Sequence, residues 1–190
     1  MDLPRRKTLP HEIPLWIDPR KEVYFITINC KERFDYGRDI ALRCPDTQYG
    51  RDGALRRPDA AAQRPYQGNQ LALPDVSARL FDTIRHRQEN FLWWPHVFLL
   101  MPDHVHALIS FPPSGRPLKT VISKWKEWTA KEIGIDWQRD FFEHRLRHDE
   151  SRREKADYIL QNPVRKKLVA RPEDWPFVYF ADGVRDIASW

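Results

Sequence analysis

Residues 96–111 read HVFLLMPDHVHALISF, and this stretch decides the fold that the rest of the chain completes. Residues 96–101 form an almost unbroken apolar run, which is typical of a buried strand. Pro102-Asp103 is a pair common in turns. Residues 104–111 alternate between two faces in the manner of a second strand. The stretch therefore predicts an antiparallel hairpin in the middle of a sheet.

Five segments with clear periodicity flank this hairpin. The two that predict strands are rich in β-branched and aromatic residues, and the three that predict helices place apolar residues three and four apart. In chain order they are strand 22–29, helix 76–92, helix 118–134, strand 141–144 and helix 149–162. The order predicts an α+β fold of the ferredoxin-like, split βαβ type. We expect an antiparallel sheet with helices on one face, its other face free for a site, and an additional C-terminal helix.

The ends and faces of these helices can also be predicted. Asp75 is a candidate N-cap for helix 76–92. Pro163 is expected to end the last helix, because the residue before proline disfavours helical backbone. Trp125 and Trp128 lie at helical spacing on the apolar stripe of helix 118–134, so core packing is a better interpretation for both than stacking on bases.

Composition limits the classes of protein. The 190 residues include 32 Lys+Arg and 27 Asp+Glu, with a net charge of +5. No run approaches the roughly 18 apolar residues of a membrane span, and the charged start of the chain has no apolar stretch behind it, so we expect no secretory signal. Cys30 and Cys44 are too few for a disulfide framework. We expect a reduced, cytoplasmic protein. Its basic and aromatic residues are compatible with binding to nucleic acid. They are equally compatible with an arginine-rich protein whose tryptophans fill its core.

The composition also changes along the chain. Residues 1–21 contain four prolines and no sustained periodicity, and we interpret them as an irregular N-terminal arm. Residues 45–74, rich in proline and glycine, predict a loop or insertion. The folded domain is therefore expected over 22–170, followed by a C-terminal tail at 171–190.

His104 and His106 form the first candidate site. Alternation along a strand places both on one face, while Val105 and Ala107 face the core. Imidazoles roughly 6–7 Å apart along a strand can converge on one divalent cation. Two histidines alone are more often surface residues or a hydrogen-bonded pair, so the interpretation as a metal site needs a third element.

The helix at 149–162 supplies that element. Tyr158 and Asn162 are four residues apart and so share one face of the helix. A phenol is a weak nucleophile at neutral pH and needs assistance, which a cation at a phosphodiester can give. The Asn162 carbonyl oxygen is a candidate third ligand, with Glu154 a lesser one. Tyr158 can equally be a surface residue with its hydroxyl in water.

Two motifs in this order resemble those of one known family. Residues 101–108, MPDHVHAL, resemble the HUH motif (His, hydrophobic, His). Residues 158–169, YILQNPVRKKLV, resemble the tyrosine block of REP-associated tyrosine transposases, relatives of the Insertion Sequence 200-like single-tyrosine transposases. Residues 137–147, WQRDFFEHRLR, resemble the segment that precedes the tyrosine helix in these proteins. The resemblance extends over about 22–170, without the arm and the 45–74 stretch.

This resemblance implies a metal-dependent endonuclease and strand transferase that cleaves and rejoins single-stranded or hairpin DNA of repetitive extragenic palindromes. His104, His106 and Asn162 match the family's metal ligands, and the metal is Mg²⁺ or Mn²⁺. Tyr158 matches the nucleophile that forms a 5′-phosphotyrosine intermediate. The family further implies a bacterial protein of the cytoplasm and nucleoid, acting as a monomer or homodimer.

Basic residues surround the tyrosine in sequence and are candidates for contacts with DNA phosphates, which position the nucleic acid without specifying its sequence. They are Arg145, Arg147, Arg152, Arg153, Lys155, Arg165, Lys166 and Lys167. For any single one, a solvated helix face is about as good an interpretation.

Two other functions remain open on the sequence. One is a non-catalytic DNA-binding regulator of repeat elements on the same fold. The other is a metal phosphodiesterase that activates water and leaves Tyr158 as a bystander.

Overall fold

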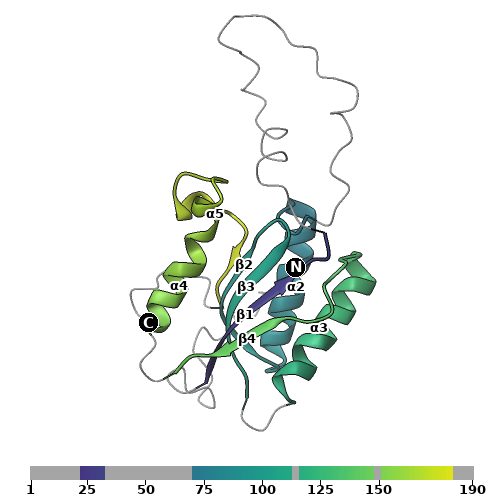
Figure 1. The fold of residues 1–190 in the computed structure, drawn as a ribbon. Helices are drawn as coiled ribbons and strands as arrows, with labels where there is room; N and C mark the ends of the chain where they lie inside the picture. The colour runs from purple at the N-terminus through teal and green to yellow at the C-terminus, as the bar shows by residue number, and fades with distance from the viewer. Residues whose placement is uncertain (1–21, 33–69, 113–115, 148–150, 182–190) are drawn as a thin grey trace, which may run out of the picture.

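The hairpin predicted at 96–111 lies within a five-stranded antiparallel sheet (Figure 1). The computed structural model describes residues 22–32, 70–112, 116–147 and 151–181. The hairpin strands are β2 (Trp94–Leu100) and β3 (His104–Ser110). The predicted N-terminal arm, most of the 45–74 stretch and the end of the predicted tail lie outside the described residues.

The remaining strands extend the sheet on both sides of the hairpin. β1 (Val23–Asn29) pairs with β3, and β4 (Phe142–Arg145) pairs with β1 at the edge. At the opposite edge β5 (Val178–Tyr179) pairs with β2, a strand that the sequence pattern did not predict. The strand order β4-β1-β3-β2-β5 confirms the predicted α+β, ferredoxin-like plan.

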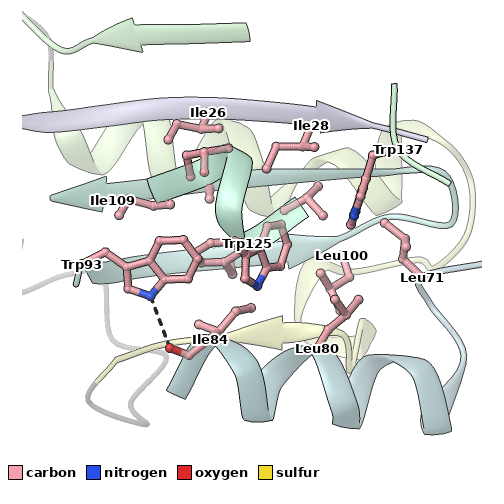
Figure 2. Packing of buried hydrophobic residues seen from close by; sticks show 14 of the residues in the cluster. Ile26, Ile28, Leu71, Leu80, Ile84, Trp93, Leu100, Ile109, Trp125 and Trp137 are labelled. Atoms are coloured by element: carbon pink, nitrogen blue, oxygen red, sulfur yellow. Dashed lines mark hydrogen bonds between the residues drawn. The ribbon is translucent and has the colours of Figure 1, made fainter. Parts of the chain in front are cut away.

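Two long helices, α2 (Pro74–Glu89) and α3 (Leu118–Ile133), cover one face of the sheet. The core between them and the sheet contains Ile26, Ile28 and three tryptophans (Figure 2). Buried indole N–H groups need acceptors, and each finds one. The Trp93 N–H donates to the Ile84 carbonyl at 3.2 Å, as Figure 2 shows.

The other face of the sheet was expected to be free, and this expectation was wrong. A second helix pair, α4 (Arg152–Leu160) and the short α5 (Asn162–Arg165), follows β4. Ala156 and Ile159 of α4 are fully buried in a second apolar cluster with Val97 and Leu99 of β2. Apolar residues on both sides of β2 and β3 explain this, because a strand that is apolar throughout is typically covered on both faces.

Trp128 corrects a second expectation. Trp125 is fully buried and its indole donates to the Thr83 hydroxyl at 2.8 Å. Trp128 is 45% exposed and lines a surface pocket with Leu92. The buried stripe of α3 continues from Trp125 to Thr129, which leaves Trp128 at its solvent side.

Helix ends differ from those predicted in two places. Asp75 is not the N-cap of α2: Leu73 occupies that position and Asp75 lies in the first turn, where a carboxylate is favourable. The tyrosine helix α4 ends before Pro163 but already at Leu160, and Pro163 lies at the start of α5, the position in a helix that tolerates proline.

The last residues of the 45–74 stretch before α2 form an irregular segment, as predicted, but this segment contributes to the core. Leu71 is fully buried, and its N–H donates to the Pro102 carbonyl at 2.9 Å. This hydrogen bond holds Leu71 beside the β2–β3 turn. The turn directly precedes the two histidines. Among the described residues, no helix has the length and apolar character to cross a membrane.

Candidate active site and metal centre

The imidazoles of His104 and His106 meet on the face of β3 that α4 partly covers. Their Nε2 atoms lie 3.2 Å apart and their rings are nearly perpendicular. Both residues are only 9% exposed. The convergence expected from the strand alternation is therefore present, but in a sheltered position and not on an open surface.

The far nitrogen of each ring is held by a neighbour. Nδ1 of His104 lies 2.6 Å from a carboxylate oxygen of Asp103, which is itself buried. Nδ1 of His106 lies 2.9 Å from the Thr27 hydroxyl on β1. A carboxylate accepts only, so it keeps the proton of His104 on Nδ1 and leaves the Nε2 lone pair directed at the neighbouring ring.

The hydroxyl of Thr27 can donate or accept, so it is compatible with either tautomer of His106. In one tautomer Nε2–H of His106 donates to His104, which is a hydrogen-bonded pair. In the other, Nδ1–H donates to Thr27 and both Nε2 lone pairs face a common point. The network thus permits the second state without any movement of the rings.

Burial keeps His106 neutral. The pKa of His106 is lowered to about 3, first by burial and then by the nearby His104, while the Asp103 carboxylate opposes the shift. At neutral pH the ring therefore carries one proton and not two, and in the tautomer with Nδ1–H its Nε2 lone pair is available to a cation.

The distance between the two Nε2 atoms is suitable for binding one divalent cation. Ligands roughly 2.1 Å from one metal, at angles between octahedral and tetrahedral, lie about 3.0–3.4 Å apart. The observed Nε2–Nε2 distance of 3.2 Å falls in this range. Held Nδ1 atoms are also typical of metal-binding histidines. In the described part of the chain, no cluster of three or more His, Cys, Asp or Glu is arranged to hold a metal, so a third protein ligand would have to be of another type.

Asn162 was the predicted third ligand, and the structure gives it a different contact. Its amide nitrogen donates to the carbonyls of Tyr158 and Ile159 at 3.0 Å each. These bonds satisfy carbonyls at the end of α4. No hydrogen bond joins Asn162 to either histidine within the described ranges, and its side-chain oxygen is the atom left for a ligand.

Tyr158 lies on the exposed side of α4 and reaches the histidines through Phe25. Ser151 is the N-cap of the helix, and its hydroxyl accepts from the Glu154 N–H at 3.1 Å. Ala156 and Ile159 anchor one side of the helix, which leaves Tyr158 45% exposed on the other. The Tyr158 ring meets Phe25 edge-on at 6.4 Å, and Phe25 stacks on His106 at 5.6 Å.

Two of the predicted DNA-contacting cations surround the tyrosine ring. The Arg165 guanidinium lies 4.5 Å from the centre of the Tyr158 ring. The Lys155 ammonium lies 5.9 Å from the same centre and 5.4 Å from that of Phe25. Cations over aromatic faces at these distances are attracted to them. Two positive charges therefore lie close to the ring of the candidate nucleophile.

The other predicted cations are not gathered at Tyr158. Arg145 pairs in register with Tyr24, so alternation directs it to the opposite sheet face from Phe25. Arg152 is partly buried, and its charge contributes to lowering the pKa of His96 to about 3, after burial. The remaining four are exposed: Arg147 follows β4, Arg153 lies in the first turn of α4, and Lys166 and Lys167 follow α5.

Sequence reasoning missed Thr27, Phe25 and the role of Asp103. Asp103 was interpreted only as a turn residue. Thr27 and Phe25 carry no motif, since they reach the site through pairing of strands almost eighty residues apart. Their alternation on β1 was the one available signal, because residues 25, 27 and 29 share a face.

This combination of a ferredoxin-like sheet, a central strand with paired histidines and a tyrosine helix on the same face resembles the REP-associated tyrosine transposases. A curated protein of Haemophilus influenzae named as a REP-associated tyrosine transposase is 33% identical over 103 residues. That match covers 45% of this chain and 58% of the relative, so less than two thirds of the relative's length is spanned. No protein-family model matches the sequence.

A solved structure of a REP-associated tyrosine transposase bound to a REP hairpin shares the fold. The TM-score is 0.58 at 19% sequence identity, and the match covers 98% of this chain and 93% of that one. The relative in sequence supports the resemblance stated from the motifs, and the structural neighbour shows that the two chains share a fold.

Proposed function

We propose that this chain is a metal-dependent single-stranded DNA endonuclease and strand transferase that cleaves and rejoins hairpin or palindromic repeat DNA. The single observation that carries the proposal is the convergence of two Nε2 atoms, 3.2 Å apart, on the sheet face that also bears the tyrosine helix. The family resemblance supports the same reaction.

His104 and His106 would hold a divalent cation, Mg²⁺ or Mn²⁺, with the Asn162 side-chain oxygen as the proposed third ligand. Mixed nitrogen and oxygen donors suit Mn²⁺ and are compatible with Mg²⁺. When bound, the cation would offset charge on the scissile phosphate. Asp103 and Thr27 would orient the two imidazoles toward it.

Tyr158 is the proposed nucleophile. Its phenolic oxygen attacks the phosphorus, the phenol loses its proton, and the bond to the 3′ oxygen breaks. The 3′ oxygen takes up a proton and leaves as a free hydroxyl, while the 5′ side remains on Tyr158 as a phosphotyrosine. Attack by a 3′ hydroxyl on this intermediate reverses the step and rejoins a strand. The exposure of Tyr158 supports this role, because a phosphodiester can reach it.

Lys155 and Arg165 are proposed to receive the phosphate beside Tyr158. Both already lie over the tyrosine ring, and charge-assisted bonds from such groups to phosphate are strong. Arg147, Arg153, Lys166 and Lys167 would bind flanking phosphates, giving a steep dependence of affinity on salt.

The proposed partner is hairpin DNA of repetitive extragenic palindromes, met in the bacterial cytoplasm and nucleoid. The solved structural neighbour is bound to a REP hairpin, and the basic surface around α4 and α5 suits a polyanion. The protein would act as a monomer or a homodimer.

A denaturing gel with labelled single-stranded repeat hairpin and Mn²⁺ tests the proposal. The wild-type chain should give a protein–DNA adduct that survives denaturation. Tyr158→Phe should abolish the adduct, and His106→Ala should abolish cleavage while leaving binding. Tyr24→Phe is the matched control, because Tyr24 packs into the core on the other sheet face.

The same gel separates the alternatives. Cleavage that persists in Tyr158→Phe, with no adduct in any variant, would identify a water-activating phosphodiesterase. Binding without cleavage in the wild type would identify a non-catalytic regulator of repeat elements.

A further inference from the structure

Phe142 is a large aromatic side chain exposed at the edge of the sheet. It is the first residue of β4, and 56% of it is accessible to solvent. It pairs in register with Thr27 on β1. Paired residues of antiparallel strands point to the same face, so Phe142 lies on the face of Thr27 and His106, the face of the candidate site.

The Phe142 ring continues a row of rings that leads to the site. It meets Phe25 at 6.1 Å in an edge-to-face arrangement. Phe25 in turn contacts Tyr158 at 6.4 Å and stacks on His106 at 5.6 Å. The exposed ring is thus separated from the candidate nucleophile by a single residue.

The chain that leads into β4 is fixed by a buried cation. The Lys126 ammonium donates to the carbonyls of Gln138 at 2.8 Å and Arg139 at 2.7 Å. Lys126 is 7% exposed, and its ammonium also lies 5.6 Å from the centre of the Phe141 ring. Phe142 is therefore presented on an ordered segment, which lowers the entropy that binding on its face would lose.

The charges around the row favour one kind of occupant. Lys155 and Arg165 lie over the rings of Phe25 and Tyr158, so two cations lie beside the aromatic row. The neighbouring acidic residue, Glu143, has the opposite orientation on β4 and pairs with Lys119 at 3.6 Å. Cations for phosphates beside a ring for a base is the pattern that binds single-stranded nucleic acid.

We propose that Phe142 is a stacking site for an unpaired nucleobase next to the phosphate that Tyr158 attacks. This inference rests on the proposed function and adds a base-binding subsite to it. A base inside a duplex already has stacking neighbours, so the subsite favours a single-stranded flank of a hairpin over paired DNA.

The test uses the full-length chain and a hairpin oligonucleotide with a single-stranded flank. 2-Aminopurine is placed at one flank position at a time, since stacking on an aromatic ring quenches its fluorescence. The wild type should quench at one position beside the cleavage point. Phe142→Ala should abolish that quenching and raise Kd by about 5- to 150-fold, whereas Phe142→Trp should retain both.

Phe91→Ala is the matched control, because Phe91 is also 56% exposed but follows α2, the helix on the other sheet face. It should leave quenching and Kd unchanged. Unaltered quenching in Phe142→Ala, in a wild-type chain that forms the covalent adduct, overturns the stacking site and leaves the proposed function intact. Quenching that depends on Phe142, without any adduct in the wild type, supports the base site and contradicts the cleavage reaction.

Discussion

Thr27 and His106 face each other across the β1–β3 pair, and the Thr27 hydroxyl lies 2.9 Å from Nδ1 of the imidazole. This contact ties the orientation of one ring of the histidine pair to a strand far away in sequence. Because the hydroxyl can donate or accept, the ring can present either a proton or a lone pair at Nε2. The metal-binding state is then the one in which Thr27 accepts.

Thr27→Val removes this hydroxyl while preserving shape. We expect the affinity for Mn²⁺ to fall by about 10- to 100-fold, as for other residues that orient metal-binding histidines. Isothermal titration calorimetry of Mn²⁺ into the free protein measures it. Thr120→Val, at an exposed position of α3, should bind as the wild type does. Equal affinities for Thr27→Val and the wild type would show that Thr27 has no orienting role.

Asp103 should act on His104 through both geometry and charge. Asp103→Asn retains an oxygen that can accept from Nδ1–H but loses the negative charge, so we expect Mn²⁺ affinity to fall by less than about 10-fold. Asp103→Ala loses both and should reduce it by about 10- to 100-fold. The same titration, beside a thermal melt of each variant, measures the gradation. A reversed order of the two variants would contradict it.

His96 should make stability depend on pH. Burial first, and the charge of Arg152 second, lower its pKa to about 3. Below pH 6.5 the unfolded chain takes up a proton that the folded chain does not, so unfolding becomes easier as pH falls from 6.5 toward 3. Each such histidine contributes a slope of about 1.4 kcal/mol per pH unit.

Urea titrations between pH 7 and 4 measure this slope. His96→Gln keeps a polar partner for the Ser110 hydroxyl, which lies 2.8 Å from Nε2, and removes the titrating group. The unfolding free energy of the variant should depend less steeply on pH than that of the wild type. The part of the dependence that comes from His106 should remain. Parallel curves for the variant and the wild type would contradict the assignment.

The two tryptophans of α3 should differ sharply in their contribution to stability. Trp125→Ala removes a fully buried indole and its bond to Thr83, and should cost about 3–5 kcal/mol. Trp128→Ala, at a 45% exposed position, should cost about 1 kcal/mol or less. Urea denaturation measures both, and similar losses would contradict the structure.

The hairpin and its flanking helices were predictable because each carries its own periodicity. The alternation of His104 and His106 against Val105 and Ala107 also settled which way the imidazoles point. The cover over this face was not predicted, since α4 is short and its apolar stripe, Ala156 and Ile159, is too small to be decisive in the sequence.

Contacts between distant strands account for the rest of what sequence reasoning missed. Thr27, Phe25 and Phe142 join the site only through the register of β4 on β1 and of β1 on β3. The prediction that Trp128 is buried failed for a different reason. Two tryptophans three residues apart can both fit an apolar stripe, and only tertiary packing decides which side of the stripe is covered.

The central claim is that Tyr158 forms a covalent bond to DNA. Mass spectrometry of the proteolysed adduct, formed with a repeat hairpin and Mn²⁺, tests it most directly. The account predicts a peptide that includes Tyr158 and carries a nucleotide through its 5′ phosphate on that residue. A nucleotide on any other residue, or cleaved DNA with a free 5′ phosphate and no modified peptide, would contradict it.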